Sequence, residues 1–432
     1  MQVGSVHYFL FKLGVTRALL RASALLSNIV FRLMLSYWAG VPLNSLTYIH
    51  FFEFSTSLLL EVPLGIVSDK YGRLRCAIIG YILMLVSMLH IFFLCEFFKS
   101  NSYDNHLTVY FLFYIVIGIL LGSGSALISG SVEAYYQQKL DDIKTADNEY
   151  LVDNSFVVST QFGRFLPLLS LALAFVLGFL LYRNQTTHYI FLLAATGFGL
   201  NAVLIYRDQV VFGDSHSKKH EKNTPFVFQL LKNKTFCYAS FQVLISYILL
   251  IISSYLLIAL GQYYTFLNRK TLYGVLFIYT FGQVALVWLV QSTIFSNADY
   301  LTRHSFVMFK VLFYFLLLLL SSLFIIFLKG SKTNVAFLIC IVGLLGTMGS
   351  MCVHAIQFKC KNIVTYMSKE KNYAASLSIL NMPGMIAISI FFIVQGIYFE
   401  GCLPLPNFLY LNIVFCVVGI LHSILFNPNP SQ

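Results

Sequence analysis

Four charged side chains and two glycines are concentrated in a short segment, Gly65–Arg75, that separates two long apolar runs. The apolar runs are Phe51–Leu64 on one side and Cys76–Leu94 on the other. Two hydrophobic helices must therefore reverse direction here at a membrane surface, and glycine lets the backbone turn tightly. Asp69 and Arg73 are spaced so that they can form an ion pair. The segment thus predicts an ion pair that can form and break, and no covalent chemistry.

Three further charged residues lie well inside predicted spans, away from their ends: Arg32, Glu53 and Arg164. An unpaired charge in the centre of a membrane span costs about 2.5–3.5 kcal/mol on insertion scales, so such side chains usually face a bundle interior or a water-filled cavity. Arg32 and Glu53 lie at similar depths in neighbouring predicted helices, which favours an ion pair. The pair has two interpretations: a proton-coupling site, in which Glu53 is protonated when the arginine moves away, or a fixed structural contact.

Arg164 has no acidic residue at its predicted depth. It is either a cavity cation that meets an anionic substrate, or a guanidinium that hydrogen-bonds to carbonyl groups or, through water, to Glu133. The apolar runs of the C-terminal half carry amides and histidine in place of acids, which favours proton coupling in the N-terminal half and substrate contacts in the C-terminal half. The candidate cavity residues, with Arg164, are Gln283, His354 and Asn381.

The elements that must position these side chains are long apolar helices. The chain has 432 residues, of which 58% are hydrophobic and only 10% are charged, and a soluble domain of this length carries more charge. Strands of a membrane barrel are shorter and alternate in polarity, so we predict an all-α polytopic membrane protein. Windows of about 20 mostly apolar residues predict twelve spans at 16–38, 44–66, 75–97, 108–136, 151–181, 188–206, 236–262, 271–295, 305–328, 334–357, 374–398 and 405–426.

The distribution of the 28 lysines and arginines predicts the orientation. Most of them fall on one side of the membrane if both termini are cytoplasmic, in agreement with the positive-inside rule. They are dispersed between the apolar runs and not gathered on one face. We therefore predict no nucleic-acid partner, although the net charge is +11.

The longest polar stretch predicts the domain organisation. It occupies 207–235 and would be a cytoplasmic linker between two six-helix bundles, 1–206 and 236–432. The spacing of Asp69 and Arg73 recurs faintly at Asp299 and Arg303, in the equivalent loop of the second half. Two six-helix halves related by a parallel repeat occur in some transporter folds.

These motifs resemble those of a known protein family. The segment Gly65–Arg75 resembles motif A of the major facilitator superfamily, the loop between helices two and three with the pattern G-x-x-x-D-[RK]-x-G-R-[RK]. Segments Glu61–Gly65, Gly122–Ala126 and Ser129–Ala134 resemble one bacterial branch of that superfamily, and the twelve predicted spans and the central linker extend the resemblance over the whole chain. The residues that match motif A are Gly65, Asp69, Lys70, Gly72, Arg73 and, one position late, Arg75.

Two patterns of the family are missing. Many members have an arginine in helix four at the position that Gly118 occupies here. The Gly-Pro signature of antiporters is also absent from helix five, which reads Gln161–Pro167 at that point. An assignment as an exporter therefore cannot rest on that signature.

The resemblance implies that motif A is half of a latch between the two bundles. Asp69 would meet the N-terminus of span eleven, near residues 372–376, where a carboxylate is favoured by about 0.3–1 kcal/mol. Arg73 would bridge Asp69 to Glu133 at the cytoplasmic end of span four. The latch would hold the outward-open state and release in the inward-open state.

The function that the resemblance implies is secondary active transport by alternating access. We expect proton-coupled export of a small amphipathic compound, such as a drug, peptide antibiotic, siderophore or metabolite, across the inner (plasma) membrane of a bacterium. Proton-coupled uptake of a small nutrient is the alternative, although acidic and amide clusters typical of sugar symporters are not evident. We expect membrane lipid, a small-molecule substrate and protons as partners, a monomeric state, and neither a cofactor nor a metal.

A polytopic membrane enzyme is a distant alternative. It would need a constellation of His, Asp or Glu in a loop at the membrane surface, and the candidates Asp141–Asp142, His216 and His220 have no metal or nucleotide motif around them. The eight cysteines show no C-x-x-C spacing and lie mostly in apolar runs, where they fit small buried hydrophobic residues. We therefore expect a transporter and not an enzyme.

Overall fold

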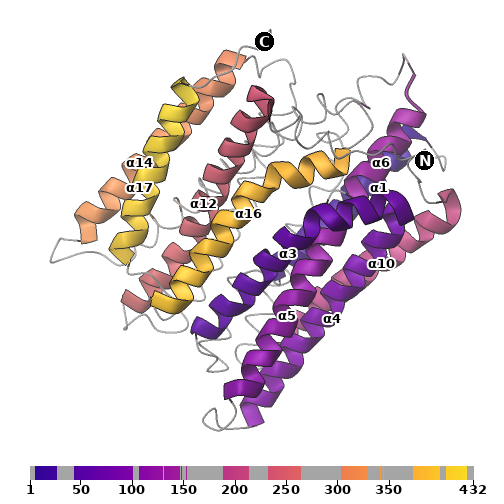
Figure 1. Cartoon of the computed structure of the whole chain (residues 1–432), viewed down its shortest axis with the longest axis horizontal. Coiled ribbons are helices and arrows are strands. Elements are labelled where there is room, and N and C mark those ends of the chain that lie inside the picture. The colour runs from indigo at the N-terminus through magenta and orange to yellow at the C-terminus, as the bar shows by residue number, and fades with distance from the viewer. Residues whose placement is uncertain are drawn as a thin grey trace. The chain divides into compact units, whose positions relative to one another are not determined.

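The computed structural model describes residues 5–26, 43–100, 107–129, 131–145, 147, 152, 188–213, 232–263, 303–328, 341, 344, 373–398 and 405–425. The regular secondary structure of these residues is helical throughout (Figure 1), which confirms the all-α prediction. The chain divides into two compact units. The first unit comprises Met1–Thr224 with Thr365–Ile379, and the second comprises Pro225–Val364 with Leu380–Gln432.

The first unit is built from long helices that pack side by side. In it α5 packs against α3 and α4, α4 packs against α10, and α10 packs against α1. The short helix α6 contacts α1 and α4 at one end of these helices (Figure 1). The described helices of this unit are α1 (Val6–Leu26), α3 (Leu43–Tyr71), α4 (Arg73–Ser100), α5 (Leu107–Ile128), α6 (Ser131–Asp142) and α10 (Tyr189–Phe212).

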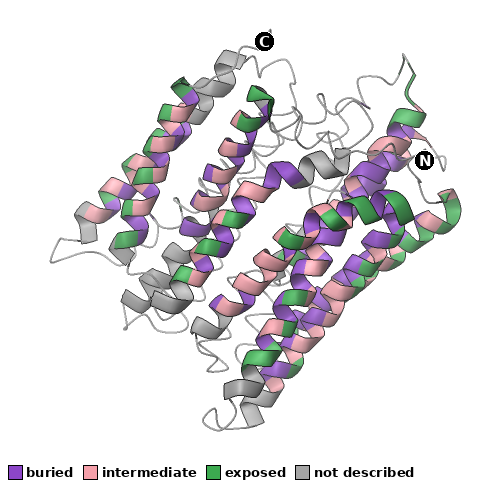
Figure 2. Ribbon diagram, in the orientation of Figure 1, coloured by how far each residue is buried: buried purple, intermediate pink, exposed green. Residues whose placement is uncertain are grey.

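The second unit has α17 at the centre of its described packing, against α14 and α12. Its described helices are α12 (Lys234–Tyr263), α14 (Arg303–Leu328), α17 (Leu405–Leu425) and the part of α16 (Tyr373–Tyr398) that begins at Leu380. Buried and exposed positions both occur along α12, α14 and α17 (Figure 2). The buried side chains include Val243, Tyr314 and Leu409, and exposed ones such as Leu312 and Val414 are also apolar. Apolar side chains on both the inward and the outward faces are expected of helices surrounded by lipid.

Within the described residues, five candidate segments are long and apolar enough to cross a membrane. They are Thr47–Tyr71, Arg73–Glu96, Phe111–Asp142 (which takes in both α5 and α6), Tyr189–Phe212 and Asn407–Leu425. They correspond to spans that the sequence predicts. The predicted spans 151–181, 271–295 and 334–357 lie almost entirely outside the described residues. The number twelve therefore stays a prediction.

The first helix differs from the prediction. The sequence predicts a span over 16–38, whereas α1 runs from Val6 to Leu26, and residues 27–42 lie outside the described residues. The predicted span leaves Lys12 outside it and has Arg17 at its cytoplasmic start. Each of them instead forms an ion pair with a carboxylate of another helix. Because their charges are paired, the helix can begin before them.

The predicted fourth span, 108–136, also differs, because α5 ends at Ile128 and a separate helix, α6, begins at Ser131. Ser129 lies in the turn between them. Its hydroxyl donates a hydrogen bond to Oε1 of Glu61 on α3, at 2.9 Å. The chain between α5 and α6 is thereby attached to α3, which helps to set the position of α6.

The contact between α5 and its neighbours depends on the absence of side chains. A Cβ atom at Gly122 would lie 2.3 Å from the carbonyl oxygen of Glu53, and one at Gly118 would lie 3.1 Å from the backbone nitrogen of the same residue. On the side of α4, a Cβ atom at Gly124 would lie 2.9 Å from the carbonyl oxygen of Gly80. Small residues allow membrane helices to approach this closely. The glycines of α5 therefore allow both α3 and α4 to pack closely against it, in the arrangement that the turn between them connects.

Candidate functional site

A single residue, Gly72, connects α3 to α4. Its φ angle is 114°, in a region that residues with side chains rarely adopt. The amide of Gly72 donates to the carbonyl of Ser68 at 3.0 Å, and the amide of Cys76 donates to the carbonyl of Gly72 at 3.2 Å, so hydrogen bonding continues through the turn. The sequence interpretation that both glycines of the segment make the turn is wrong for Gly65. This residue is buried inside α3, and Gly72 alone reverses the chain.

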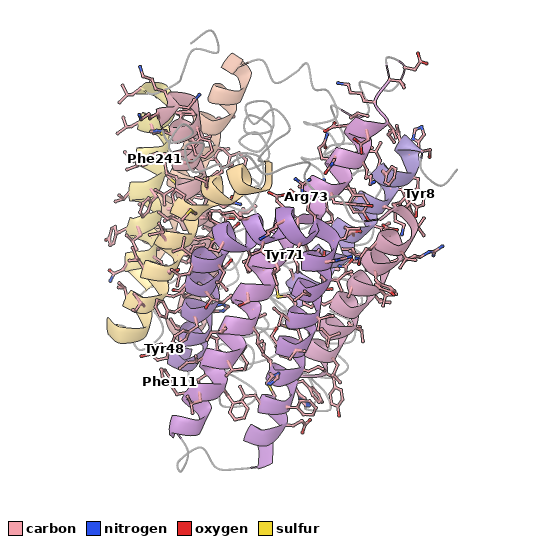
Figure 3. The ribbon with its side chains drawn as sticks, turned by 45° about the vertical axis from the view of Figure 1, so that its right-hand side comes forward. Tyr8, Tyr48, Tyr71, Arg73, Phe111 and Phe241 are labelled. Carbon is pink, nitrogen blue, oxygen red and sulfur yellow. The ribbon has the colours of Figure 1, made fainter. Side chains whose placement is uncertain are left out.

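Asp69 and Arg73 form an ion pair across this turn. Nε of Arg73 donates to Oδ1 of Asp69 at 2.9 Å, and the two side chains are only 7% and 8% exposed. Figure 3 shows Arg73 and Tyr8 at one end of the helices of the first unit, and Tyr48 and Phe111 at the other. Solvent and salt screen a buried pair less than a surface pair, so the charge of either residue is costly to leave without the other.

Arg73 also attaches the turn to α6. Its Nη1 donates to the carbonyl oxygen of Ala134 at 3.0 Å and to Oε1 of Gln138 at 3.1 Å. Beside this contact, the hydroxyl oxygens of Ser68 and Ser131 lie 2.8 Å apart. The turn between α3 and α4 and the first half of α6 therefore form one hydrogen-bonded junction.

The partner that we predicted for Arg73 on α6 is not the one observed. Glu133 forms an ion pair with Arg17 of α1, with Oε1 and Nη2 3.1 Å apart. Ala134 and Gln138 are four residues apart and share the face of α6 that meets Arg73, whereas the side chain of Glu133 reaches α1. The predicted bridge through Arg73 to Glu133 is thus replaced by two separate contacts on different faces of α6.

The remaining basic residues of the motif point away from the junction. Lys70 and Arg75 are both exposed, and Nζ of Lys70 lies 5.2 Å from the ring centre of Tyr71. The predicted contact of Asp69 with residues 372–376 involves side chains outside the described residues. That half of the latch therefore stays a prediction.

A second buried carboxylate, Asp208 of α10, joins three helices near the same end. Nζ of Lys12 lies 2.9 Å from its Oδ1, the hydroxyl of Tyr136 donates to its Oδ2 at 2.5 Å, and the hydroxyl of Tyr8 donates to Oδ1 at 3.5 Å. The side chain of Asp208 is 2% exposed. Sequence reasoning missed this site because it assigned residues 207–212 to the linker, whereas they continue α10. The apolar residues that follow Asp208 are the feature of the sequence that could have indicated the continuation of the helix.

Glu53 has a partner on its own helix that we did not predict from the sequence. Nδ1 of His50, one turn earlier on α3, lies 3.1 Å from Oε2 of Glu53. The histidine side chain is 2% exposed and the glutamate side chain 16% exposed. Arg32, which we predicted as the partner, lies outside the described residues. The titratable site in this part of α3 therefore includes an imidazole as well as a carboxylate.

Three of the four predicted cavity residues, Arg164, Gln283 and His354, lie outside the described residues. The fourth, Asn381, is on α16 and 9% exposed. Close to it, a Cβ atom at Gly384 would lie 2.2 Å from the ring of Tyr247, so α16 and α12 are in close contact there. Among the residues that the structure describes, no group of three His, Cys, Asp or Glu side chains could hold a metal ion.

Comparison with known proteins identifies the family. A sequence model of the Major Facilitator Superfamily matches residues 18–392, which is most of the chain. The chain belongs to the Major Facilitator Superfamily. No curated protein sequence matches it.

Solved structures of other transporters have a similar fold. A bacterial homologue of the iron transporter ferroportin, in an outward-facing state, is 14% identical with a TM-score of 0.67, over 97% of this chain and 99% of that one. A mutant of the nucleoside transporter NupG is 13% identical with a TM-score of 0.66, over 98% of this chain and 99% of that one. At this identity the likeness concerns the fold alone. Together with the family match, it identifies the chain as a membrane transporter.

The structure explains why this chain has a glycine at position 118, where many members of the Major Facilitator Superfamily have an arginine. A Cβ atom at Gly118 would lie 2.5 Å from Cβ of Phe52 and 2.8 Å from the carbonyl oxygen of Ile49. A longer side chain does not fit unless α3 and α5 separate. In this chain the position serves helix packing.

Proposed function

We propose that the chain is a proton-coupled secondary transporter that works by alternating access and exports a small amphipathic compound from a bacterial cell. The observation that carries the proposal is the buried pair of Asp69 and Arg73 at a one-residue turn. Such a pair keeps the α3–α4 turn in one arrangement while its charges are satisfied. A change of partners would favour another arrangement, as alternating access requires.

The gate in this proposal consists of the α3–α4 turn and α6 moving as one body. Arg73 donates to both Asp69 and the backbone of α6, so the turn cannot move without either carrying α6 with it or breaking those bonds. Asp69 keeps further acceptor capacity for the start of span eleven, near residues 372–376. We propose that this second contact closes the gate on the cytoplasmic side.

We propose that Glu53 is the site of proton coupling. A carboxylate in an apolar span is costly when charged, and a histidine is the side chain that most readily changes charge near neutral pH. His50 and Glu53 are in contact at 3.1 Å, and together they can hold or release a proton more readily than either residue isolated in hydrocarbon. Arg32 remains the predicted third member of this site.

The amphipathic substrate is inferred from the predicted cavity residues. Arg164 offers a cation, and Gln283, His354 and Asn381 offer neutral hydrogen-bonding groups among many apolar side chains. Such a cavity suits a compound with a polar or anionic group on an apolar body. Proton-coupled uptake of a small nutrient uses the same machinery in the opposite direction and is the alternative.

The experiment is transport by the purified protein in liposomes of known orientation. A panel of amphipathic dyes, peptide antibiotics and siderophores is loaded on the cytoplasmic side, and a pH gradient is imposed. Export of one class that stops in Asp69→Asn, and continues in a variant of the exposed Arg75, Arg75→Lys, supports the proposal. Gradient-driven flux in the opposite direction replaces export with uptake, and an unimpaired Asp69→Asn variant contradicts the gate.

A further inference from the structure

A buried polar cluster connects three helices of the second unit. Gln242 of α12 is 1% exposed, and its Nε2 lies 2.7 Å from Nδ1 of His422 on α17. The hydroxyl of Tyr314 on α14 donates to Oε1 of the same amide at 3.2 Å. Ser423 Oγ lies 3.5 Å from the amide nitrogen. The amide of Gln242 is therefore the point at which α12, α14 and α17 are bonded together.

The imidazole of His422 is fixed in position by aromatic rings of α12. The ring of Tyr238 is stacked on it at 4.9 Å and an angle of 15°, and the ring of Phe241 lies 4.3 Å away. Tyr314 is fixed as well, because its ring lies directly over Gly419, where a Cβ atom would come within 2.8 Å. The donor and acceptor atoms of the cluster thus have little freedom to change partners by moving.

The direction of the hydrogen bonds determines the charge state of the histidine. Because Oε1 of Gln242 accepts from Tyr314, the end of the amide that faces His422 is its NH2 group, which only donates. Nδ1 of His422 must then accept. The arrangement therefore holds the neutral imidazole that carries its proton on Nε2.

Protonation of His422 would reverse this requirement. Nδ1 would become a donor and would face the NH2 group of Gln242, so the amide would have to turn over. The buried hydroxyl of Tyr314 could then accept from the NH2 group but could no longer donate to Oε1, and the contact of the amide nitrogen with Oγ of Ser423 would be lost. One proton on His422 therefore breaks or rearranges the contact between α17 and the other two helices.

The charged form also has support in the fold. His422 lies in the last turn of α17, where the helix dipole favours a cation, and the ring of Tyr238 on α12 is stacked on it. Among the residues that the structure describes, the titratable groups that face this cluster are Tyr238 of α12 and Tyr314 of α14. Lys234 begins α12 with its side chain exposed, and Lys310 precedes Tyr314 by one turn in the sequence of α14. Both charge states of His422 thus have partners.

We propose that His422 is a protonation site of the second unit, which closes the contact of α12, α14 and α17 when neutral and loosens it when charged. A histidine inside a membrane helix is a functional candidate by default, and histidine changes charge between about pH 5 and 8. The inference goes beyond the proposed function, which places proton coupling at Glu53 in the first unit. It requires no particular substrate or direction of transport.

The test is a double-mutant cycle on the full chain in detergent, with thermal unfolding as the readout. Gln242→Leu and His422→Phe are made singly and together, and the interaction between them is measured at pH 8 and pH 5. We expect a clear interaction at pH 8 that falls at least about twofold at pH 5. An equal interaction at both pH values overturns the proposal.

A matched cycle controls for general effects of pH. Asn412 of α17 donates to Ser321 of α14 at 2.8 Å, in a buried contact that has no histidine. The interaction between Asn412→Leu and Ser321→Ala should be the same at both pH values, and an equal change in both cycles contradicts a site at His422. If Gln242→Leu does not fold, Tyr314→Phe removes one hydroxyl from the cluster. It should lower the unfolding midpoint at pH 8 and not at pH 5, and the reverse result overturns the proposal.

Discussion

Nη1 of Arg73 lies 3.0 Å from the backbone carbonyl oxygen of Ala134, so the arginine of motif A is held by the backbone of α6. A backbone acceptor is present whatever side chain stands at that position. The guanidinium can donate to this carbonyl while its Nε donates to Asp69, because the fork of an arginine presents several donors in a fixed plane. The shape of this side chain therefore helps to set the position of α6 relative to the α3–α4 turn, together with the contact of Ser68 and Ser131.

Replacement of Arg73 by lysine should disable this junction although the charge is kept. A lysine ammonium is a single point at the end of a flexible chain and cannot reach the positions of both Nε and Nη1. We expect a lower thermal unfolding midpoint and loss of transport in liposomes. Arg75→Lys, the same change at an exposed position two residues away, is the control. If Arg73→Lys behaves like the control, the fork geometry is not required.

Gly122→Val should destabilise the first unit. The new Cβ atom would lie 2.3 Å from the carbonyl oxygen of Glu53, a backbone atom that cannot rotate away, so α3 and α5 must separate. Overpacking costs about 1–3 kcal/mol. Thermal unfolding in detergent measures the effect, with Ile119→Val at a 43% exposed position of the same helix as the control. An unchanged midpoint in Gly122→Val would show that the close contact is not maintained.

Asp208→Asn should be one of the most destabilising single changes in the first unit. It leaves the ammonium of Lys12, 11% exposed, without its carboxylate, and loss of one partner of a buried pair typically costs about 3–5 kcal/mol. Adding Lys12→Met to the same chain removes the unpaired charge and should recover part of the loss. Unfolding midpoints of the two single variants and the double variant provide the measurement. Strictly additive losses would argue that the two residues do not interact.

Glu53→Gln should uncouple transport from the pH gradient. The amide cannot bind and release a proton, so gradient-driven flux should be lost while exchange of substrate for substrate continues. Both rates are measured in liposomes. The control is Glu96→Gln, which alters the carboxylate in contact with His188 elsewhere in the unit. Loss of both activities in Glu53→Gln, or of neither, counts against coupling at this residue.

Much of the first unit could be predicted because its features are local in the sequence. The runs before and after Gly65–Arg75 are mostly apolar, and hydrocarbon requires helices there because the backbone must satisfy its own hydrogen bonds. The pairing of Asp69 with Arg73 follows from their spacing on either side of a one-residue turn. The membrane class, the helical fold and the family are likewise properties of composition and motif.

Two errors in helix boundaries, at the start of α1 and at the end of α10, have one physical cause. Lys12 and Asp208 were assigned to polar flanks because a charge in an apolar environment is costly when it is alone. The two residues neutralise each other at 2.9 Å, and their partnership spans most of the first half of the chain. No local pattern reveals a partner at that distance in sequence.

What only the tertiary structure decided is which face of each helix meets which neighbour. The sequence places Ala134 and Gln138 on one face of a helix and Glu133 on another, but it does not determine that Arg73 approaches the first face and Arg17 the second. The same holds for the bond between Gln242 and His422, since both lie in apolar runs far apart in the chain. The apolar pattern determines that these segments form helices, because in hydrocarbon the backbone must satisfy its own hydrogen bonds. Their rotation and pairing depend on the packing of all helices together, which a linear pattern does not encode.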